Sequence, residues 1–163
     1  MREMTLDIEG LGFILYSPTA VAHIEEGTDY LQHHFSDGAD VARHVMECQL
    51  TAFGTGSPGT FVLRFIEGSP PEQVVEASTY KLRLGLEVHT GSICVRDLYD
   101  LIDWSSKCPP TQRLSLPDGW YRLTVVSSRP PSGITGDGQK IDIYFEPTDS
   151  KPQLRWEGVP TLC

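Results

Sequence analysis

Residues 80–88 read YKLRLGLEV, and this stretch decides the expected fold class. Its apolar side chains fall on every second residue and alternate with polar or small ones. A period of two places the apolar set on one face of an extended chain and the polar set on the other. The stretch therefore predicts a half-buried antiparallel strand, with a turn at 89–92 and a short partner strand at 93–96.

The same alternation recurs along the chain, between turn signals supplied by 15 Gly and 12 Pro residues. Short segments of this kind are typical of many strands rather than of long helices. The loop 54–59 and the Pro-Asp-Gly turn 117–119 are expected to join their neighbouring strands as hairpins. Further strands are expected at 6–8, 13–16, 46–52, 61–65, 113–116, 120–126 and 141–145.

Helical signals are few. Residues 18–35 can hold a short helix, with Ser17 as its N-cap and Pro18 at its first position. Apolar spacing favours one or two further helical turns between residues 97 and 104. Together these signals predict an all-β or mostly β fold, namely an antiparallel β-sandwich or open barrel of about eight or nine short strands with at most one or two short helices.

The length of 163 residues fits one domain, because a chain of this size buries a core without metal or disulfide staples. We expect a single β-rich domain over 1–163, in which residues 146–163 form a C-terminal tail that packs back on the body. The four Cys residues are scattered without a CxxC pair and are expected to be free thiols.

The chain carries 22 acidic and 13 basic side chains, a net charge of −9. This charge disfavours nucleic acid and anionic membranes, whose phosphates it would repel, and it permits a basic protein partner. The alternative is that acidity only keeps the protein soluble. The first residues carry acids where a signal peptide is apolar, and no apolar stretch approaches the roughly 20 residues that span a bilayer. We expect a cytoplasmic protein, monomeric or homodimeric.

His33, His34 and Asp37 form the only cluster of potential metal ligands in the sequence. A metal site needs three or four converging ligands in an ordered frame, so a surface loop is the favoured interpretation of this cluster. We therefore expect no metal and no cofactor.

Motifs for nucleophilic or phosphate chemistry are incomplete. Ser57 lacks the G-x-S-x-G spacing of a serine elbow. The Gly-rich stretch 133–140 lacks the adjacent Gly-Lys and the following helix of a P-loop. A thiol–imidazole pair of Cys94 or Cys108 with His89 has no local sequence support. We expect no catalytic residues.

Asp97, Asp100 and Asp103 recur every three residues, and on a helical segment they lie roughly on one face. One interpretation is a solvated face. The other is an acidic patch for a basic partner, with Tyr99 and Trp104 as the aromatic anchors that interfaces favour. These five residues are the candidate partner-binding site.

Five segments follow one another along the chain: the loop 36–40 (SDGAD), the strand 60–65 (TFVLRF), the alternating strand 82–88, the stretch 114–124 (LSLPDGWYRLT) and the strand 141–143. Their order resembles the ComJ-like family, small bacterial inhibitors of a competence-associated DNA-entry nuclease. The resemblance spans residues 12–145 as a pattern and leaves the tail 146–163 unplaced. It implies a non-enzymatic, β-rich, acidic binding protein, and no binding residues can be carried over.

Three functional hypotheses follow from these observations. The first is a non-catalytic protein-binding module, an inhibitor or immunity-type protein for a nuclease or another basic partner. The second is a small-ligand binder or enzyme on a β-sandwich or barrel, since such folds often enclose pockets. The third is an oligomeric assembly subunit that pairs through its edge strands.

Overall fold

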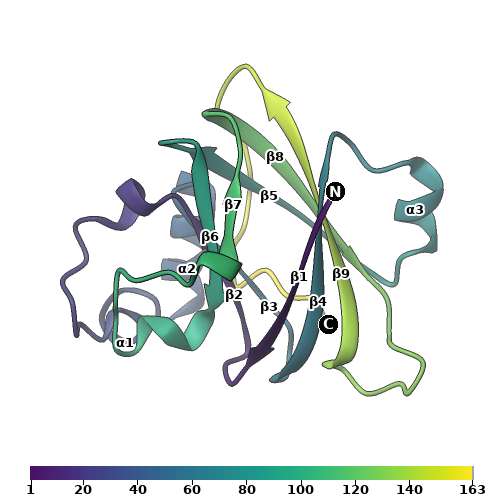
Figure 1. Ribbon diagram of the computed structural model, residues 1–163, viewed down its shortest axis with the longest axis horizontal. Coiled ribbons are helices and arrows are strands. Elements are labelled where there is room, and N and C mark those ends of the chain that lie inside the picture. The colour runs from purple at the N-terminus through teal and green to yellow at the C-terminus, as the bar shows by residue number, and fades with distance from the viewer. Residues whose placement is uncertain (163) are drawn as a thin grey trace.

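The computed structural model describes residues 1–162 and has two β-sheets packed face to face (Figure 1). One sheet has five strands in the order β1-β4-β9-β8-β5, and the other has four in the order β3-β2-β6-β7. The architecture confirms the expected mostly β sandwich. The strands are β1 (Arg2–Ile8), β2 (Gly12–Tyr16), β3 (Leu50–Gly54), β4 (Gly59–Glu67), β5 (Tyr80–Val88), β6 (Ser92–Asp97), β7 (Arg113–Ser115), β8 (Gly119–Ser127) and β9 (Asp137–Thr148).

Two features differ from the expectation. Strands β4 and β9 pair in parallel, so the five-stranded sheet is mixed rather than purely antiparallel. Residues 1–162 also hold three short α-helices instead of one or two. These are α1 (Tyr30–His34), α2 (Gly38–Glu47) and α3 (Glu72–Ala77), accompanied by the 3₁₀-helices η1 (Pro18–Val21), η2 (Leu98–Leu101) and η3 (Pro110–Gln112).

The three expected hairpins are wrong, because each turn carries the chain from one sheet to the other. Strands β3 and β4, β5 and β6, and β7 and β8 are consecutive in sequence but lie in different sheets. The turn at 89–92 closes with a single bridge between His89 and Ser92. The Ser17 hydroxyl accepts from the His89 amide and donates to the Ser92 carbonyl, both at 2.8 Å. It thereby holds the start of β6 beside β2, and β5 pairs with β8 instead.

The strand expected at 46–52 is confirmed only from Leu50 onward, because Met46 and Glu47 form the end of a helix. Asp37 caps α2 by accepting from the Asp40 amide at 2.8 Å, and Val41 and Val45 give the helix one buried face. Cys48 then adopts a left-handed conformation with φ 62°, and the strand begins only at Leu50. Ser17 precedes η1 as expected, but its side chain forms no cap.

The core lies between the two sheets. Phe13 of β2 meets Phe61 of β4 edge-on, with the ring centroids 5.6 Å apart. Both rings are fully buried, as are Leu84 and Leu123 on neighbouring strands of the five-stranded sheet. Each such side chain stabilises the fold by about 1.5–3 kcal/mol through burial. This layer is the one that the alternating sequence pattern predicts.

A further layer of short helices covers the other face of the four-stranded sheet (Figure 1). It consists of η1, α1, α2 and η2, and we call it the helical layer (residues 17–49 and 97–108). Every residue of β2 and β3 is buried as a result. On the opposite face of the molecule, the outer face of the five-stranded sheet has the short helix α3 beside it (Figure 1).

The C-terminal segment lies against the body of the protein. Thr161 forms a parallel bridge with Gly54, and the Gly54 amide donates to the Pro160 carbonyl at 2.6 Å. Leu162 is buried in the core, and the Trp156 indole donates to the Arg83 carbonyl. Among residues 1–162, no helix has the length and apolar character needed to cross a membrane.

Candidate functional site

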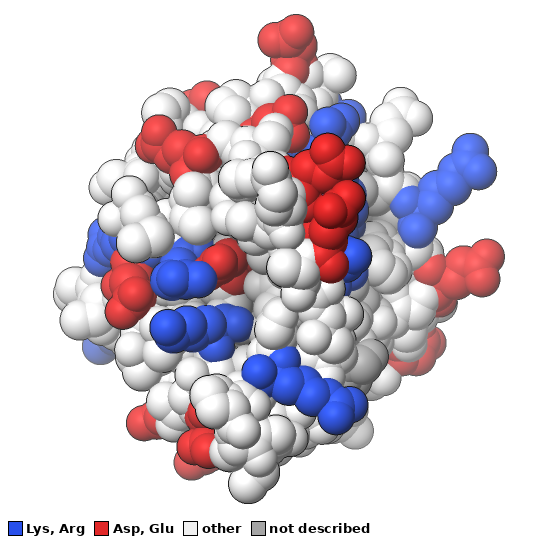
Figure 2. Space-filling view, turned by 90° about the vertical axis from the view of Figure 1, so that its right-hand side faces the viewer, with Lys and Arg blue, Asp and Glu red and all other residues white. Residues whose placement is uncertain are grey.

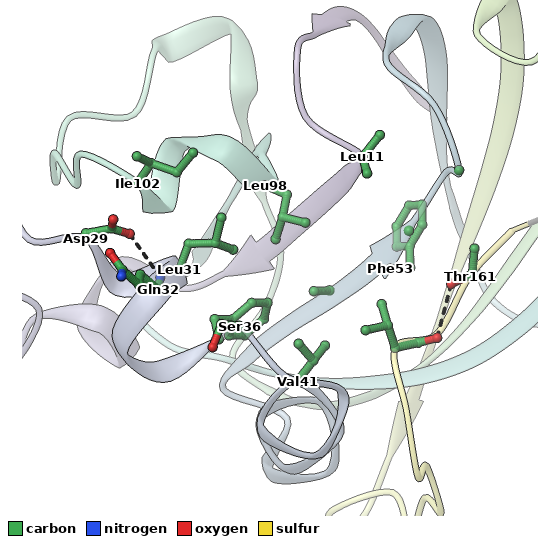
Figure 3. Close-up of a pocket in the computed structure, with 15 residues that line it drawn as sticks. Leu11, Asp29, Leu31, Gln32, Ser36, Val41, Phe53, Leu98, Ile102 and Thr161 are labelled. Carbon is green, nitrogen blue, oxygen red and sulfur yellow. Dashed lines mark hydrogen bonds between the residues drawn. The ribbon is translucent and has the colours of Figure 1, made fainter.

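An open cavity of about 620 Å³ lies where the helical layer meets the end of β3 and the C-terminal segment (Figure 3). Its volume is within the range of about 300–1,000 Å³ that is typical of binding pockets. Its lining is mostly apolar. The residues that line it are Leu11, Asp29, Leu31, Gln32, Phe35, Ser36, Val41, Ala52, Phe53, Gly54, Gly56, Leu98, Ile102, Val159 and Thr161.

Hydrogen-bonded caps hold the walls of this cavity in place. Asp29 caps α1 by accepting from the Gln32 amide at 3.0 Å. On the opposite wall the Thr161 hydroxyl donates to the Val159 carbonyl at 3.1 Å. Figure 3 shows both bonds, with the side chains of Leu31 and Leu98 facing the same space. The cavity therefore lies between the capped helix α1 and the C-terminal segment, which are distant in sequence.

Exposed apolar side chains concentrate around the cavity. Leu11, Ile102 and Val159 line it and are 47%, 41% and 45% exposed. These three are half of the six large hydrophobic side chains that are exposed within residues 1–162. A contiguous exposed apolar patch beside polar groups is typical of a protein- or ligand-binding site.

The helical layer around the cavity is strongly acidic. Residues 17–49 and 97–108 contain nine Asp and Glu and two Lys and Arg, a net charge of −7 within a chain total of −9. One of these carboxylates, Asp29, lines the cavity itself. Most of the excess negative charge is thus carried by the layer that forms much of the cavity wall.

The structure separates the five predicted partner-binding residues into three kinds. Asp97 and Asp100 are engaged within the protein: Asp97 accepts from the Glu9 amide at 2.8 Å, and Asp100 accepts from Arg96 at 2.8 Å. Tyr99 and Asp103 are exposed beside the cavity wall. Trp104 is only 1% exposed, so its prediction as a surface anchor is wrong.

Trp104 is buried because it belongs to a cluster around Arg96. The Arg96 guanidinium lies 4.6 Å from the centre of the Trp104 ring and donates to Tyr16 Oη at 3.0 Å and to the Ser105 carbonyl at 2.6 Å. Burial raises the pKa of Tyr16, so its hydroxyl is neutral and accepts this bond. This cluster fixes η2 on the sheet and positions the cavity wall above it.

The apolar lining was missed by the sequence analysis. Leu98 and Ile102 come from the predicted segment itself, and their spacing of four residues was the available signal. Leu11, Phe53 and Val159 come from three distant segments, and no local pattern relates them. Only the fold brings these side chains together.

The cysteines in the described part of the chain are free thiols, as expected, and they are buried. Cys48, Cys94 and Cys108 are free and buried, whereas Cys163 lies outside the described residues. Burial raises the pKa of Cys94 to about 12, so this thiol is not a nucleophile near neutral pH.

The predicted cluster of potential metal ligands does not converge on one point. Within residues 1–162, no group of three potential ligands has the geometry for a metal ion. His33 and His34 lie on α1, and Asp37 is engaged as the cap of α2.

The helical layer holds one buried histidine. The His44 Nδ1 lies 2.7 Å from the Asp40 carbonyl, which only accepts, so Nδ1 carries the proton. Its Nε2 then accepts from Tyr30 Oη, also at 2.7 Å. Burial lowers the pKa of His44 below its ordinary value. The ring is a structural tie between α1 and α2.

The fold of this chain is similar to that of known proteins. No family model and no curated protein sequence matches the chain. Two solved structures are similar: ComJ from Bacillus subtilis, inhibitor of the DNA degrading activity of NucA, and the protein named crocagin biosynthetic gene J. The former has a TM-score of 0.52 at 14% identity over 91% of this chain and 96% of that one. The latter has a TM-score of 0.52 at 12% identity over 87% and 94%.

At these identities the likeness concerns the fold. It confirms that this chain has the same kind of fold as ComJ, as the segment order indicated, and that the resemblance extends beyond residues 12–145. One of the two similar structures is an inhibitor that acts on another protein.

Proposed function

We propose that this chain is a non-catalytic, inhibitor-type binding protein whose helical layer docks a basic protein partner. The observation that carries the proposal is the coincidence, on one face, of the apolar cavity and a net charge of −7. A nuclease is a fitting class of partner, because a DNA-binding surface is basic and an acidic protein can occupy it. The fold shared with an inhibitor of a DNA-degrading protein supports this choice.

The two parts of the face have different roles in the proposed complex. The apolar cavity accepts one or more apolar side chains of the partner and supplies most of the affinity, as the desolvated centre of an interface does. The carboxylates around it attract Lys and Arg side chains and mainly speed association. Asp103 is the predicted site residue best suited to this second role, because it is exposed and has no hydrogen bond or ion pair within residues 1–162.

The test of the apolar part is a matched pair of variants. A partner is captured from the native host's lysate at low salt, identified and purified, and then titrated against the purified chain. Ile102→Lys should weaken its affinity at least about tenfold, equivalent to about 1.4 kcal/mol. Ile134→Lys is the control, since Ile134 is 64% exposed and lies outside the cavity lining. An equal loss in both variants would contradict docking at the cavity.

The test of the acidic part is a second pair with the same change in net charge. Asp103→Lys should slow association severalfold at low salt, and the difference should shrink as salt rises. Asp149→Lys, at an exposed position just after β9, should leave the association rate unchanged. Binding that is indifferent to salt would sink the proposed role of the carboxylates.

A small apolar ligand is the second candidate occupant, because the cavity lining alone would accept one. Native mass spectrometry of the freshly purified chain distinguishes the two. A retained ligand would be lost in Ile102→Lys but kept in Asp103→Lys, whereas a basic protein partner responds to both changes.

A further inference from the structure

A second concave site lies on the opposite side of the molecule. A groove of about 520 Å³ runs between α3, the β8–β9 loop and the outer face of the five-stranded sheet. Figure 2 shows several Lys and Arg side chains side by side across this face, among acidic ones. The groove itself is lined by three basic side chains and one acidic one, in a chain whose net charge is −9.

The first of these cations is held rigidly, with donors to spare. Arg64 on β4 donates through Nε and Nη2 to the two carboxylate oxygens of Asp142 on the adjacent strand β9, at 2.5 and 2.8 Å. Asp142 is thereby fully engaged. Within residues 1–162 no acceptor is found for Nη1 of Arg64, which remains free to bind a ligand.

The other two cations are not neutralised by any carboxylate of the described chain. Arg129 donates through Nε to Tyr80 Oη at 3.1 Å, and within residues 1–162 no partner is found for either terminal nitrogen. Lys140 is exposed and takes part in none of the ion pairs among residues 1–162. The Ser128 hydroxyl accepts from the Thr79 amide, so its own proton is available as a donor.

Most of the remaining lining is apolar, although Ser78 and Ser127 also contribute to it. Its apolar side chains are Val74 and Ala77 of α3, Val126 of β8, and Pro130 and Pro131 of the β8–β9 loop. A groove that combines several free donors with apolar side chains fits a ligand with a compact anionic group and a less polar body. The lining has an excess of two positive charges, which matches the charge of a phosphate monoester at neutral pH.

We propose that this groove binds the phosphate group of a small molecule through Arg64, Arg129 and Lys140, with the body of that molecule between α3 and the proline-rich loop. Arg64 is bound to Asp142 through Nε and Nη2, and Arg129 is bound to Tyr80 through Nε, which leaves the other guanidinium donors of both unpaired within residues 1–162. Guanidinium groups with free donors favour oxyanions. The site is independent of the acidic face, and its occupancy does not depend on the protein partner proposed above.

The experiment is an amide NMR titration of the ¹⁵N-labelled full chain at low ionic strength. The probes are adenosine monophosphate, inorganic phosphate and adenosine, with sodium chloride at matched ionic strength as the blank. Adenosine monophosphate should shift the amides of Ser128 and Gly138 saturably and bind more tightly than inorganic phosphate. Adenosine and chloride should leave these amides unmoved.

Variants decide whether the groove is responsible. Lys140→Gln and Arg129→Gln should each weaken binding of adenosine monophosphate at least fivefold. Arg122→Gln is the control, because Arg122 lies on the same sheet outside the groove lining. An equal loss in Arg122→Gln, binding of adenosine as tight as that of its phosphate, or identical shifts with chloride would overturn the proposal.

Discussion

The two outer faces of this sandwich differ in their balance of acidic and basic side chains. On the five-stranded sheet, outward basic side chains lie next to acidic ones on neighbouring strands, as in the pairs Arg64–Asp142 and Arg122–Glu146. The helical layer, in contrast, contains nine carboxylates and only two basic side chains. The net charge of −9 is therefore carried mainly by the helical layer, which also forms much of the wall of the apolar cavity.

The charges that stabilise the fold also differ between the two faces. Beneath the helical layer the essential cation is buried. The side chain of Arg96 on β6 is 6% exposed and donates to Tyr16 of β2, to Asp100 of η2 and to the Ser105 carbonyl. On the sheet face the pair Arg122–Glu146 is exposed to water, where an ion pair contributes about 0–1 kcal/mol. The stability of the helical layer on the sheet therefore relies on one internal cation. The stability of the five-stranded sheet does not rely on any one of its ion pairs.

The largest expected effect comes from removing that cation. Arg96→Leu should lower the free energy of unfolding by about 3 kcal/mol, because it leaves the buried Tyr16 hydroxyl and the Ser105 carbonyl without their donor. Urea denaturation followed by fluorescence measures the loss as a shift of the midpoint at constant slope.

The matched control is Arg122→Leu on the sheet face. Arg122 is 42% exposed and lies 3.7 Å from Glu146, so this change should cost less than about 1 kcal/mol. If both variants lose the same stability, the contrast between a buried and a surface cation fails.

A smaller effect is expected where an acidic side chain ties the helical layer to the sandwich. The Asp97 carboxylate accepts from the backbone amides of Glu9, Gly10 and Tyr99. Asp97→Ala should cost about 1–2 kcal/mol, by analogy with the loss of a helix cap. Asp103→Ala, at a carboxylate with no such bonds, should change stability by less than about 0.5 kcal/mol. A larger loss at Asp103 than at Asp97 would refute this division of roles.

The sequence predicted the strands far better than their partners. The alternation in 80–88 correctly placed the apolar residues of β5 on the core face. Alternation reports which face is buried and carries no information on which strand lies alongside. The partner was decided by contacts distant in sequence, such as the Ser17 hydroxyl at the 89–92 turn. The helix α2, in contrast, had a readable signal in the cap at Asp37 and the spacing of Val41 and Val45.

The candidate site was likewise predicted only in part from the sequence. The segment 97–104 was correctly expected to contain a helical turn, and two of its apolar residues line the cavity. Its aromatic residues could not be assigned to surface or core from sequence, because burial of Trp104 depends on Arg96 and Tyr16. The cavity itself needed the fold, since its lining comes from both ends of the chain.

The smallest effect sharpens the contrast between the acidic surface and the layer beneath it. His44 is 6% exposed and neutral, and burial lowers its pKa below that of the unfolded chain, which is about 6.5. Above pH 6.5 both states are neutral at this residue, and its contribution to stability is fully present. As the pH falls through 6.5, the unfolded chain binds a proton first, so stability is lost until the folded pKa is reached.

The stability of the wild-type chain should therefore fall more steeply between pH 7 and pH 5 than that of His44→Gln, which has no such group. Parallel urea denaturations at several pH values measure both slopes, and the common acid groups cancel in their difference. Equal slopes would mean that His44 titrates alike in the folded and unfolded chains. The tie between α1 and α2 would then be open to water, and the helical layer would not shield its interior from the acidic surface around it.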